Sequence, residues 1–386
     1  MPHISERERQ MPEQEIGKLL RIAVERKDII SLGPGEPDFP APAPIVALTK
    51  KYANQCNHYS PPGGLKELRE AIAKKLKRDN KITTSPENIV VTCGSQEALL
   101  IAAACTLDVS EQVILPDPSY MGFLPTFELF NAGIKTIPLR ERDNFEIDPD
   151  EVERAIDPKK TKVLMINSPA NPTGTVLSKK VLEQLADIAI EHDLLIFSDE
   201  AYEKILYDDA KHVSIGSLNG MEEHAVIFQS FSKTYAMCGY RLGYVAAPPE
   251  LANAIKETHV NTTICAPTIS QKIGIEALKL PAKYTDAMVK EYNRRRKLIV
   301  KRLNGMGLRT PTPKGAFYTF SNIKHLGVGS LRFCHALLEK AKVAVVPGTD
   351  FGKNGEGYIR CSYATDYKLI EKAMDKMEHF LRTYKA

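Results

Sequence analysis

Short apolar runs alternate with amphipathic stretches through the first two thirds of the chain. Runs rich in apolar and β-branched residues predict buried strands at residues 88–94, 112–120, 162–167, 194–202, 225–230 and 241–248. Between them, apolar residues at helical spacing predict helices at 65–78, 97–107, 121–131 and 181–192. This alternation is typical of an α/β domain built on a mainly parallel sheet.

The last third of the chain has a different pattern. Residues 250–304 are predicted to be helical, and a smaller α+β pattern follows. It has candidate strands at 315–320, 343–348 and 357–364 and candidate helices at 331–340 and 367–381. We expect a second domain here. The N-terminal stretch 16–26 carries an apolar stripe at helical spacing and is expected to pack against that domain.

Composition excludes several classes of partner. The 386 residues are 43% hydrophobic, and a net charge of +4 is too small to indicate a nucleic acid or an anionic membrane as partner. Seven cysteines occur without any CxxC pair, which argues against a metal site and is typical of free thiols in a reducing compartment. The N-terminus lacks the apolar core of a signal peptide, and no apolar run has membrane-spanning length. A cytoplasmic location is therefore expected.

Polar or aromatic residues follow five of the predicted strands. They are Gly94 with Ser95, Tyr120, Asn171, Asp199, and Ser230 with Lys233. Ligands of parallel sheets bind beyond the carboxyl ends of the strands, so these residues are expected to meet at one edge.

The chemistry of these residues suggests one kind of ligand. The stretch 229–244 contains Lys233 and Arg241 but no carboxylate, which favours a lowered lysine pKa and imine formation. Arg241 and the helix start at Ser95 could bind a phosphate, although no GxGxxG motif indicates a dinucleotide. A phosphorylated aromatic aldehyde would use this whole set.

For such a ligand the remaining residues have definite expected contacts. Asp199 would pair with a protonated pyridine nitrogen, and Tyr120 would stack on the ring. Asn171 and Tyr202 would hydrogen-bond the ring hydroxyl.

Six motifs in order carry a resemblance that covers nearly the whole chain. They are LGPGEPDF, YSPPGG, NPTG at 171–174, SDEAY, SFSKTYAMCGYRLGY and RCSYA at 360–364. With them the chain resembles the class I aminotransferases of pyridoxal-phosphate fold type I, and most of all the prokaryotic aspartate and aromatic aminotransferases. The resemblance implies a large domain at 46–289, an α/β/α sandwich with a mainly parallel sheet. It also implies a smaller α+β domain, made of 1–45 and 290–386, that closes over the substrate.

The resemblance also implies an activity and a set of roles. The amino group of an L-amino acid, aspartate or aromatic, would pass to 2-oxoglutarate by a ping-pong mechanism through pyridoxamine phosphate. Catalysis would use Lys233, which forms the imine and moves the proton, with Asp199 and Tyr202. Pyridoxal 5′-phosphate would also contact Tyr120, Asn171, Ser230, Arg241 and the backbone of Ser95 and Gln96. The substrate carboxylate would contact Arg360, Gly35 and Asn171. Tyr59 would reach the phosphate of the other subunit in a homodimer.

One departure and several alternatives stay open. Some aspartate enzymes of the subgroup have a lysine where this chain has Gln96, and residues 261–268 offer no arginine, so a broad or aromatic preference fits better. A lyase or synthase of the same fold would share the motifs. A nucleotide hydrolase is disfavoured because Gly348 to Lys353 lacks the spacing of a phosphate-binding loop. A non-catalytic regulator would need a DNA-binding segment, for which the short N-terminus has no room.

Overall fold

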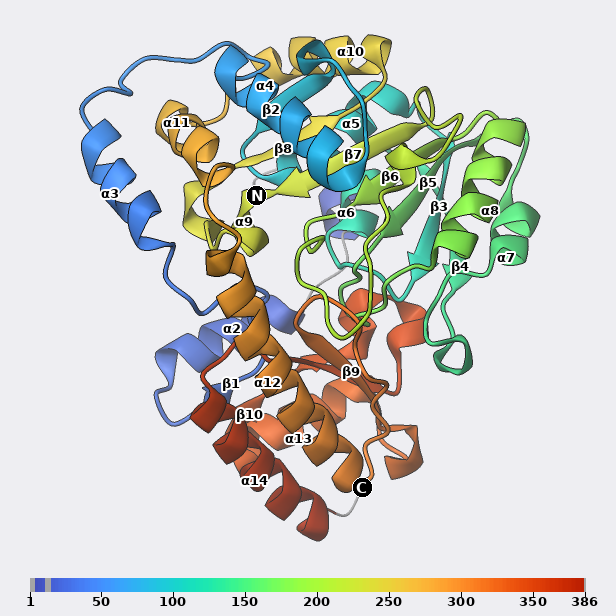
Figure 1. Cartoon of the computed structure of the whole chain (residues 1–386). Helices are drawn as coiled ribbons and strands as arrows, with labels where there is room; N and C mark the ends of the chain where they lie inside the picture. The colour runs from blue at the N-terminus through green and yellow to red at the C-terminus, as the bar shows by residue number, and fades with distance from the viewer. Residues whose placement is uncertain (1–3, 11–14, 385–386) are drawn as a thin grey trace.

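A seven-stranded sheet forms the centre of the larger part of the molecule (Figure 1). The computed structural model of the chain describes residues 4–10 and 15–384. The strand order is β2-β8-β7-β6-β5-β3-β4; β8 runs antiparallel to both of its neighbours and the other adjacent pairs are parallel. The strands are β2 (Ile89–Thr92), β3 (Gln112–Asp117), β4 (Gly133–Pro138), β5 (Thr161–Asn167), β6 (Leu195–Asp199), β7 (Ala225–Ser230) and β8 (Gly243–Ala246).

Helices cover both faces of this sheet because successive strand side chains point to opposite sides. In β5, Leu164 and Ile166 belong to one apolar core, and Val163 and Met165 belong to another. The first core includes side chains of α4 (Lys66–Lys75), α8 (Lys179–Glu191) and α11 (Thr268–Ala277). The second includes side chains of α5 (Ser95–Thr106), α6 (Phe123–Glu128) and α10 (Pro249–Thr262). The predicted α/β/α sandwich is confirmed. Shorter helices are α3 (Ala43–Tyr52), α7 (Pro149–Ala155) and α9 (Phe231–Thr234).

A second group of elements, at the bottom of Figure 1, has its own core around Tyr292, Phe317 and Ile359. Its antiparallel sheet has the order β11-β12-β9, and β1 pairs with β10 in parallel. Leu19 of α2 packs with Ile29 and Leu338, as the apolar stripe of the N-terminal segment predicted. No described helix is long and apolar enough to cross a membrane. The elements are α1 (Glu6–Gln10), α2 (Glu15–Glu25), β1 (Ile30–Ser31), α12 (Lys283–Gly305), β9 (Tyr318–Asn322), α13 (Ser330–Ala341), β10 (Val343–Ala344), β11 (Val346–Pro347), β12 (Tyr358–Ser362) and α14 (Tyr367–Thr383).

The domain boundaries stay predictions. Residues 1–3, 11–14 and 385–386 of the expected small domain lie outside the described residues.

Three elements differ from the sequence prediction. Strand β4 was not predicted: it lies at the sheet edge, and of its six residues only Ile137 is buried. The single strand predicted at 343–348 is wrong, because β10 pairs with β1 while β11 pairs with β12, in another sheet. The helix predicted to reach residue 78 ends as α-helix at Lys75, and a π-helical turn continues it to Asn80.

Candidate active site

The carboxyl ends of the parallel strands open into a cavity of about 580 Å³. It lies where the main sheet meets the second group of elements, so both contribute side chains to its wall. Every site residue predicted from the sequence lines it except Tyr59: Gly35, Ser95, Gln96, Tyr120, Asn171, Asp199, Tyr202, Ser230, Lys233, Arg241 and Arg360. The structure therefore brings together residues that are spread over 326 positions of the sequence, from 35 to 360.

Lys233 lies in α9, the short helix that follows β7. Its Nζ donates a hydrogen bond to the carbonyl oxygen of Gly35 at 2.5 Å and lies 5.9 Å from the centre of the Tyr202 ring. Burial lowers the pKa of this amine from its ordinary value and outweighs the opposite effect of the nearby Glu36 and Asp199 carboxylates. A lysine in this state is a better nucleophile than an exposed one because more of it is neutral.

Asp199 ends β6 and faces the same cavity. Its Oδ1 accepts the backbone N–H of Ala201 at 3.0 Å, and its carbonyl oxygen accepts the Asn167 side-chain amide at 2.9 Å. Burial raises the pKa of Asp199 to about 6. Asp199 is half-buried, and a carboxylate removed from water without an ion pair is costly, so this site favours a ligand that brings a positive charge.

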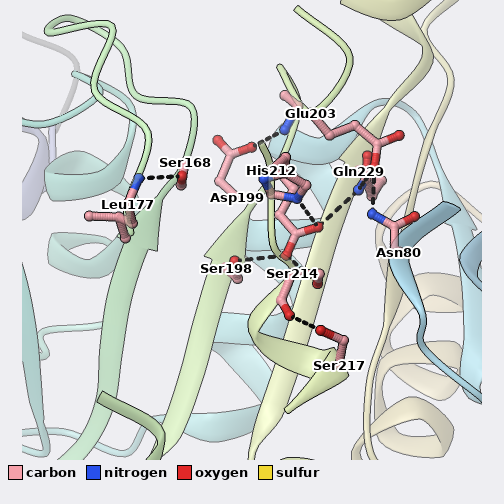
Figure 2. A network of polar contacts seen from close by, with 12 residues as sticks. Asn80, Ser168, Leu177, Ser198, Asp199, Glu203, His212, Ser214, Ser217 and Gln229 are labelled. Carbon is pink, nitrogen blue, oxygen red and sulfur yellow. Dashed lines mark hydrogen bonds and ion pairs between the residues drawn. The ribbon is translucent and has the colours of Figure 1, made fainter. Parts of the chain in front are cut away.

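A network of buried polar side chains supports the turn after Asp199 (Figure 2). Glu200 accepts hydrogen bonds from Gln229 at 3.1 Å and is bonded to His212, also at 3.1 Å. Glu203 accepts from Gln229 at 3.0 Å and forms an ion pair with the buried Lys75. Ligand atoms of Glu200, Glu203 and His212 lie within 4.8 Å of one another, a spacing suited to a metal ion, but the ammonium of Lys75 already supplies positive charge there.

The side chain of Arg241 lies close to the start of α5. Gly94 precedes the helix with φ of 89°, and a Cβ at this position would lie 2.7 Å from Nη2 of Arg241. Arg241 donates hydrogen bonds to the carbonyl oxygens of Cys93 at 3.1 Å and Cys238 at 3.0 Å. Backbone N–H groups at a helix start beside an arginine are suited to bind an anion, and Ser230 lines the same cavity.

Arg360 is 1% exposed and reaches the cavity from β12. It donates to Asn171 Oδ1 at 3.0 Å and to the carbonyl oxygen of Gly33 at 2.5 Å. Its guanidinium carbon lies over the rings of Tyr318 and Phe351, at 4.5 and 4.9 Å from their centres. Its Nε has no hydrogen-bond partner among the described residues. Burial lowers the pKa of Arg360, so a carboxylate ligand would satisfy both its charge and its free donor.

Comparison with known proteins identifies the family. Residues 27–377 match the family model "Aminotransferase class I and II". The aspartate aminotransferase of Pyrococcus abyssi is 47% identical, with 96% of each chain covered, and the aromatic-amino-acid aminotransferase 2 of Thermococcus litoralis is 43% identical, with 99% of each covered. The structure of Thermus thermophilus aspartate aminotransferase with maleate superposes with a TM-score of 0.94 at 34% identity, covering 98% of this chain and 100% of that one.

The chain belongs to the class I and II aminotransferases. It is therefore an enzyme of the transaminase type, and its cofactor is pyridoxal 5′-phosphate. The cavity of the aminotransferase fits this cofactor on two observations. The ring nitrogen would supply the positive charge that Asp199 favours, and Gly94, where a Cβ would clash with Arg241, lets this guanidinium lie close to the start of α5, where a phosphate would bind.

Tyr318 is a site residue that the sequence reasoning missed. Its hydroxyl is 2.7 Å from that of Tyr202, and its ring lies against Arg360. It also accounts for the glycine at position 35, where a Cβ would lie 2.9 Å from the Tyr318 hydroxyl oxygen. The run 315–320 was predicted as a strand, but no motif marks Tyr318. Only the alternation of side chains along β9 could have suggested which residues face the cavity.

Gln96 lies in the wall of the cavity. Its Nε2 donates to Thr126 Oγ1 at 3.1 Å, and Leu99, Phe123 and Met165 line the same cavity. The aminotransferase therefore has a neutral amide at this point of its wall.

Tyr59 lies outside the cavity of its own chain. Its side chain is 80% exposed, while the next residue, Ser60, is only 6% exposed. The structure thus does not bring Tyr59 together with the other predicted site residues within one subunit.

Proposed function

We propose that this aminotransferase moves the amino group of aspartate or an aromatic L-amino acid to 2-oxoglutarate by a ping-pong mechanism. The observation that carries this proposal is the convergence of Lys233, Asp199 and Arg360 on one cavity. Amino-group transfer needs an amine with a lowered pKa, a carboxylate in the cavity and a guanidinium that can bind a carboxylate.

Each of these residues has a proposed role. The bound cofactor supplies an electron sink for the charge left when the substrate Cα loses its proton. Lys233 takes that proton from the substrate Cα and moves it to C4′ of the cofactor. Asp199 holds the positive ring nitrogen, and Tyr202 and Asn171 hydrogen-bond the ring hydroxyl. Arg360 binds the α-carboxylate in a two-pronged contact, which orients donor and acceptor alike.

Contacts across the cavity support a proposed closure of the domain 1–45 and 290–386 over the domain 46–289. Lys233 in the large domain bonds Gly35, and Arg360 in the small domain bonds Asn171. A substrate carboxylate would compete for the Arg360 donors that now reach Asn171 and Gly33. Binding and closure would therefore be linked through Arg360, and closure would exclude water from the proton transfer.

We further propose a homodimer in which Tyr59 reaches the phosphate bound by the partner. The support is the contrast between an exposed aromatic side chain and a well-anchored backbone, since Ser60 Oγ accepts from the buried Gln271 at 2.6 Å. A rigid loop that presents an exposed tyrosine is suited to a contact with another chain.

A cytoplasmic location is also proposed. The seven cysteines are all free thiols, which suits a reducing compartment.

A broad donor preference is proposed from the cavity wall. Gln96 is neutral, and apolar side chains beside it favour an aromatic substrate through burial of apolar area. Relatives named as aspartate and as aromatic aminotransferases both align over nearly the whole chain, which supports breadth.

The test is a panel of amino donors with 2-oxoglutarate, scored by the glutamate formed. We expect glutamate in amounts equal to the keto acid produced from the donor. Keto acid and ammonia without any acceptor would instead indicate a lyase of the same fold. A donor panel that yields no glutamate would contradict the proposal.

A further inference from the structure

A buried histidine, His259, and a half-buried glutamate, Glu97, connect the turn before α5 with the loop that carries Tyr59. His259, in α10, is 0% exposed. Its Nε2 lies 3.2 Å from Oε2 of Glu97 in α5, and its Nδ1 lies 2.8 Å from the carbonyl oxygen of Pro62. Each ring nitrogen therefore faces an oxygen atom, one of a backbone carbonyl and one of a carboxylate.

Glu97 holds the turn that precedes the candidate phosphate site. Its Oε2 accepts the backbone N–H of Cys93 at 2.6 Å, and its Oε1 accepts the hydroxyl of Thr263 at 2.6 Å. Burial would raise the pKa of Glu97, but the hydrogen bonds from His259, Thr263 and the Cys93 N–H outweigh it and lower the pKa to about 2. Glu97 is therefore an ionised anchor at this turn.

The Cys93 backbone is held from both sides. Glu97 accepts its N–H, and Arg241 donates to its carbonyl oxygen at 3.1 Å. The next residue is Gly94, whose position beside Arg241 leaves no room for a Cβ. A shift of Glu97 would therefore be transmitted directly to the space between the α5 start and Arg241.

The other end of the connection is the loop that carries Tyr59. Pro62, three residues after Tyr59, is bonded to His259, and the Gly63 carbonyl accepts the N–H of Val91 at 3.1 Å. These bonds and those of Gln271 hold the backbone of the loop. His259 is thus bonded both to the loop that presents Tyr59 outward and to the glutamate behind the phosphate turn.

We propose that His259, acting with Glu97, is a positioning residue that couples the phosphate site of its own subunit to the loop that completes the partner's phosphate site. This inference rests on the proposed function, because it requires the Gly94 turn and the partner's Tyr59 to bind the cofactor phosphate. Loss of His259 would then weaken phosphate binding in its own subunit through the Cys93–Gly94 turn. It would also weaken phosphate binding in the partner through the loop that carries Tyr59.

The first experiment compares ligands with and without the phosphate. Apoprotein would be titrated with pyridoxal 5′-phosphate and with pyridoxal, and binding followed by absorbance. In His259→Gln and Glu97→Gln, the affinity for pyridoxal 5′-phosphate should fall about tenfold or more, and that for pyridoxal less than about threefold. The double variant should resemble either single one, because the two residues act as one pair. His212→Gln is the matched control: it removes a similar bond to buried Glu200, away from the phosphate, and should leave the ratio of the two affinities unchanged.

The second experiment separates the effect of His259 on its own subunit from its effect on the partner. It uses hybrid dimers in which one subunit carries Lys233→Ala. Lysine-dependent visible absorbance then reports only the other subunit's site. When the lysine-free subunit also carries His259→Gln, the reporting site is altered only through the Tyr59 loop of its partner. When the reporting subunit carries His259→Gln, its own phosphate turn is altered. We expect weaker pyridoxal 5′-phosphate binding in both hybrids than in the hybrid with Lys233→Ala alone.

The outcomes distinguish this inference from the proposed function. Parallel losses for both ligands, or a partner-altered hybrid that equals its control, would overturn the coupling. If the wild-type protein binds neither ligand, the proposed function itself fails. Wild-type binding that is unchanged in His259→Gln and Glu97→Gln would overturn the inference while leaving the proposed function intact.

Discussion

The substitution Asp199→Asn should stabilise the apoprotein while it removes most of the activity. Asparagine has the same shape and keeps an oxygen for the Ala201 N–H, so the change removes little but the charge. That charge is unfavourable in the apoprotein, since burial raises the pKa of Asp199 from 3.8 to about 6. In the proposed mechanism the same charge holds the ring nitrogen of the cofactor, so its loss should lower kcat by about a thousandfold or more.

The size of the stability effect follows from the pKa. The folded chain binds this proton more tightly than the unfolded chain, so the group contributes stability in acid and loses it as the pH rises through about 6. At pH 8 the buried charge costs ~3 kcal/mol, and at pH 5 roughly half of that. With an unfolding entropy of ~2.1 cal/mol/K per residue, the variant's Tm should exceed that of the wild type by about 4 °C at pH 8 and by about 2 °C at pH 5.

The assay is thermal unfolding of the two apoproteins at both pH values. Glu203→Gln is a control in which the Tm should change in the opposite direction. Burial would raise the pKa of Glu203, but Lys75 and His212 outweigh this effect and lower the pKa to about 2. Removing this charge should therefore lower the Tm at pH 8. Adding pyridoxal 5′-phosphate should raise the Tm of the wild type more than that of Asp199→Asn. An Asp199→Asn apoprotein no more stable than the wild type at pH 8, or a gain that is the same at both pH values, would refute the reasoning.

Four further predictions concern the cofactor, the substrate and the dimer. Lys233→Ala should lose the covalently bound cofactor and its visible absorbance; cofactor found on a lysine after borohydride reduction of the variant would contradict the assignment. Arg360→Lys keeps the positive charge but loses the two-pronged contact of the guanidinium with a carboxylate, so kcat/KM for donor and acceptor should both fall about a hundredfold. A loss confined to one half-reaction would exclude a shared carboxylate site. Gln96→Lys should raise kcat/KM for aspartate relative to phenylalanine by about tenfold, and a wild-type preference for aspartate above about a hundredfold would reveal a carboxylate site not recognised here. Mixing Tyr59→Phe and Lys233→Ala dimers should produce hybrids with about one intact site each if Tyr59 acts across the interface. Activity no better than the average of the parent dimers would place Tyr59 in the site of its own subunit.

Much of the fold could be read from short-range pattern. The apolar runs that became β5, β6 and β7 are bounded by polar turns, and a strand buried on both faces needs such a run. The same pattern placed Asn171, Asp199 and Lys233 just after strands, and parallel strands end at one edge. Strand β4 was not predicted from the sequence because an exposed edge strand needs no continuous apolar run. The division of the predicted strand into β10 and β11 was not predicted either. Each strand pairs with a segment distant in the sequence, β1 and β12 respectively, and local pattern does not specify such pairing.

The sequence by itself determined the strand and helix alternation, the family and most of the residues that line the cavity, because each depends on residue type and local spacing. Only the tertiary structure decided how these residues are held. Tyr202 meets Tyr318 across 116 positions, Lys233 meets Gly35 across 198, and Arg360 meets Gly33 across 327. Such contacts depend on how two cores pack around one cavity, and burial there, rather than any motif, sets the pKa values of Lys233, Asp199 and Arg360.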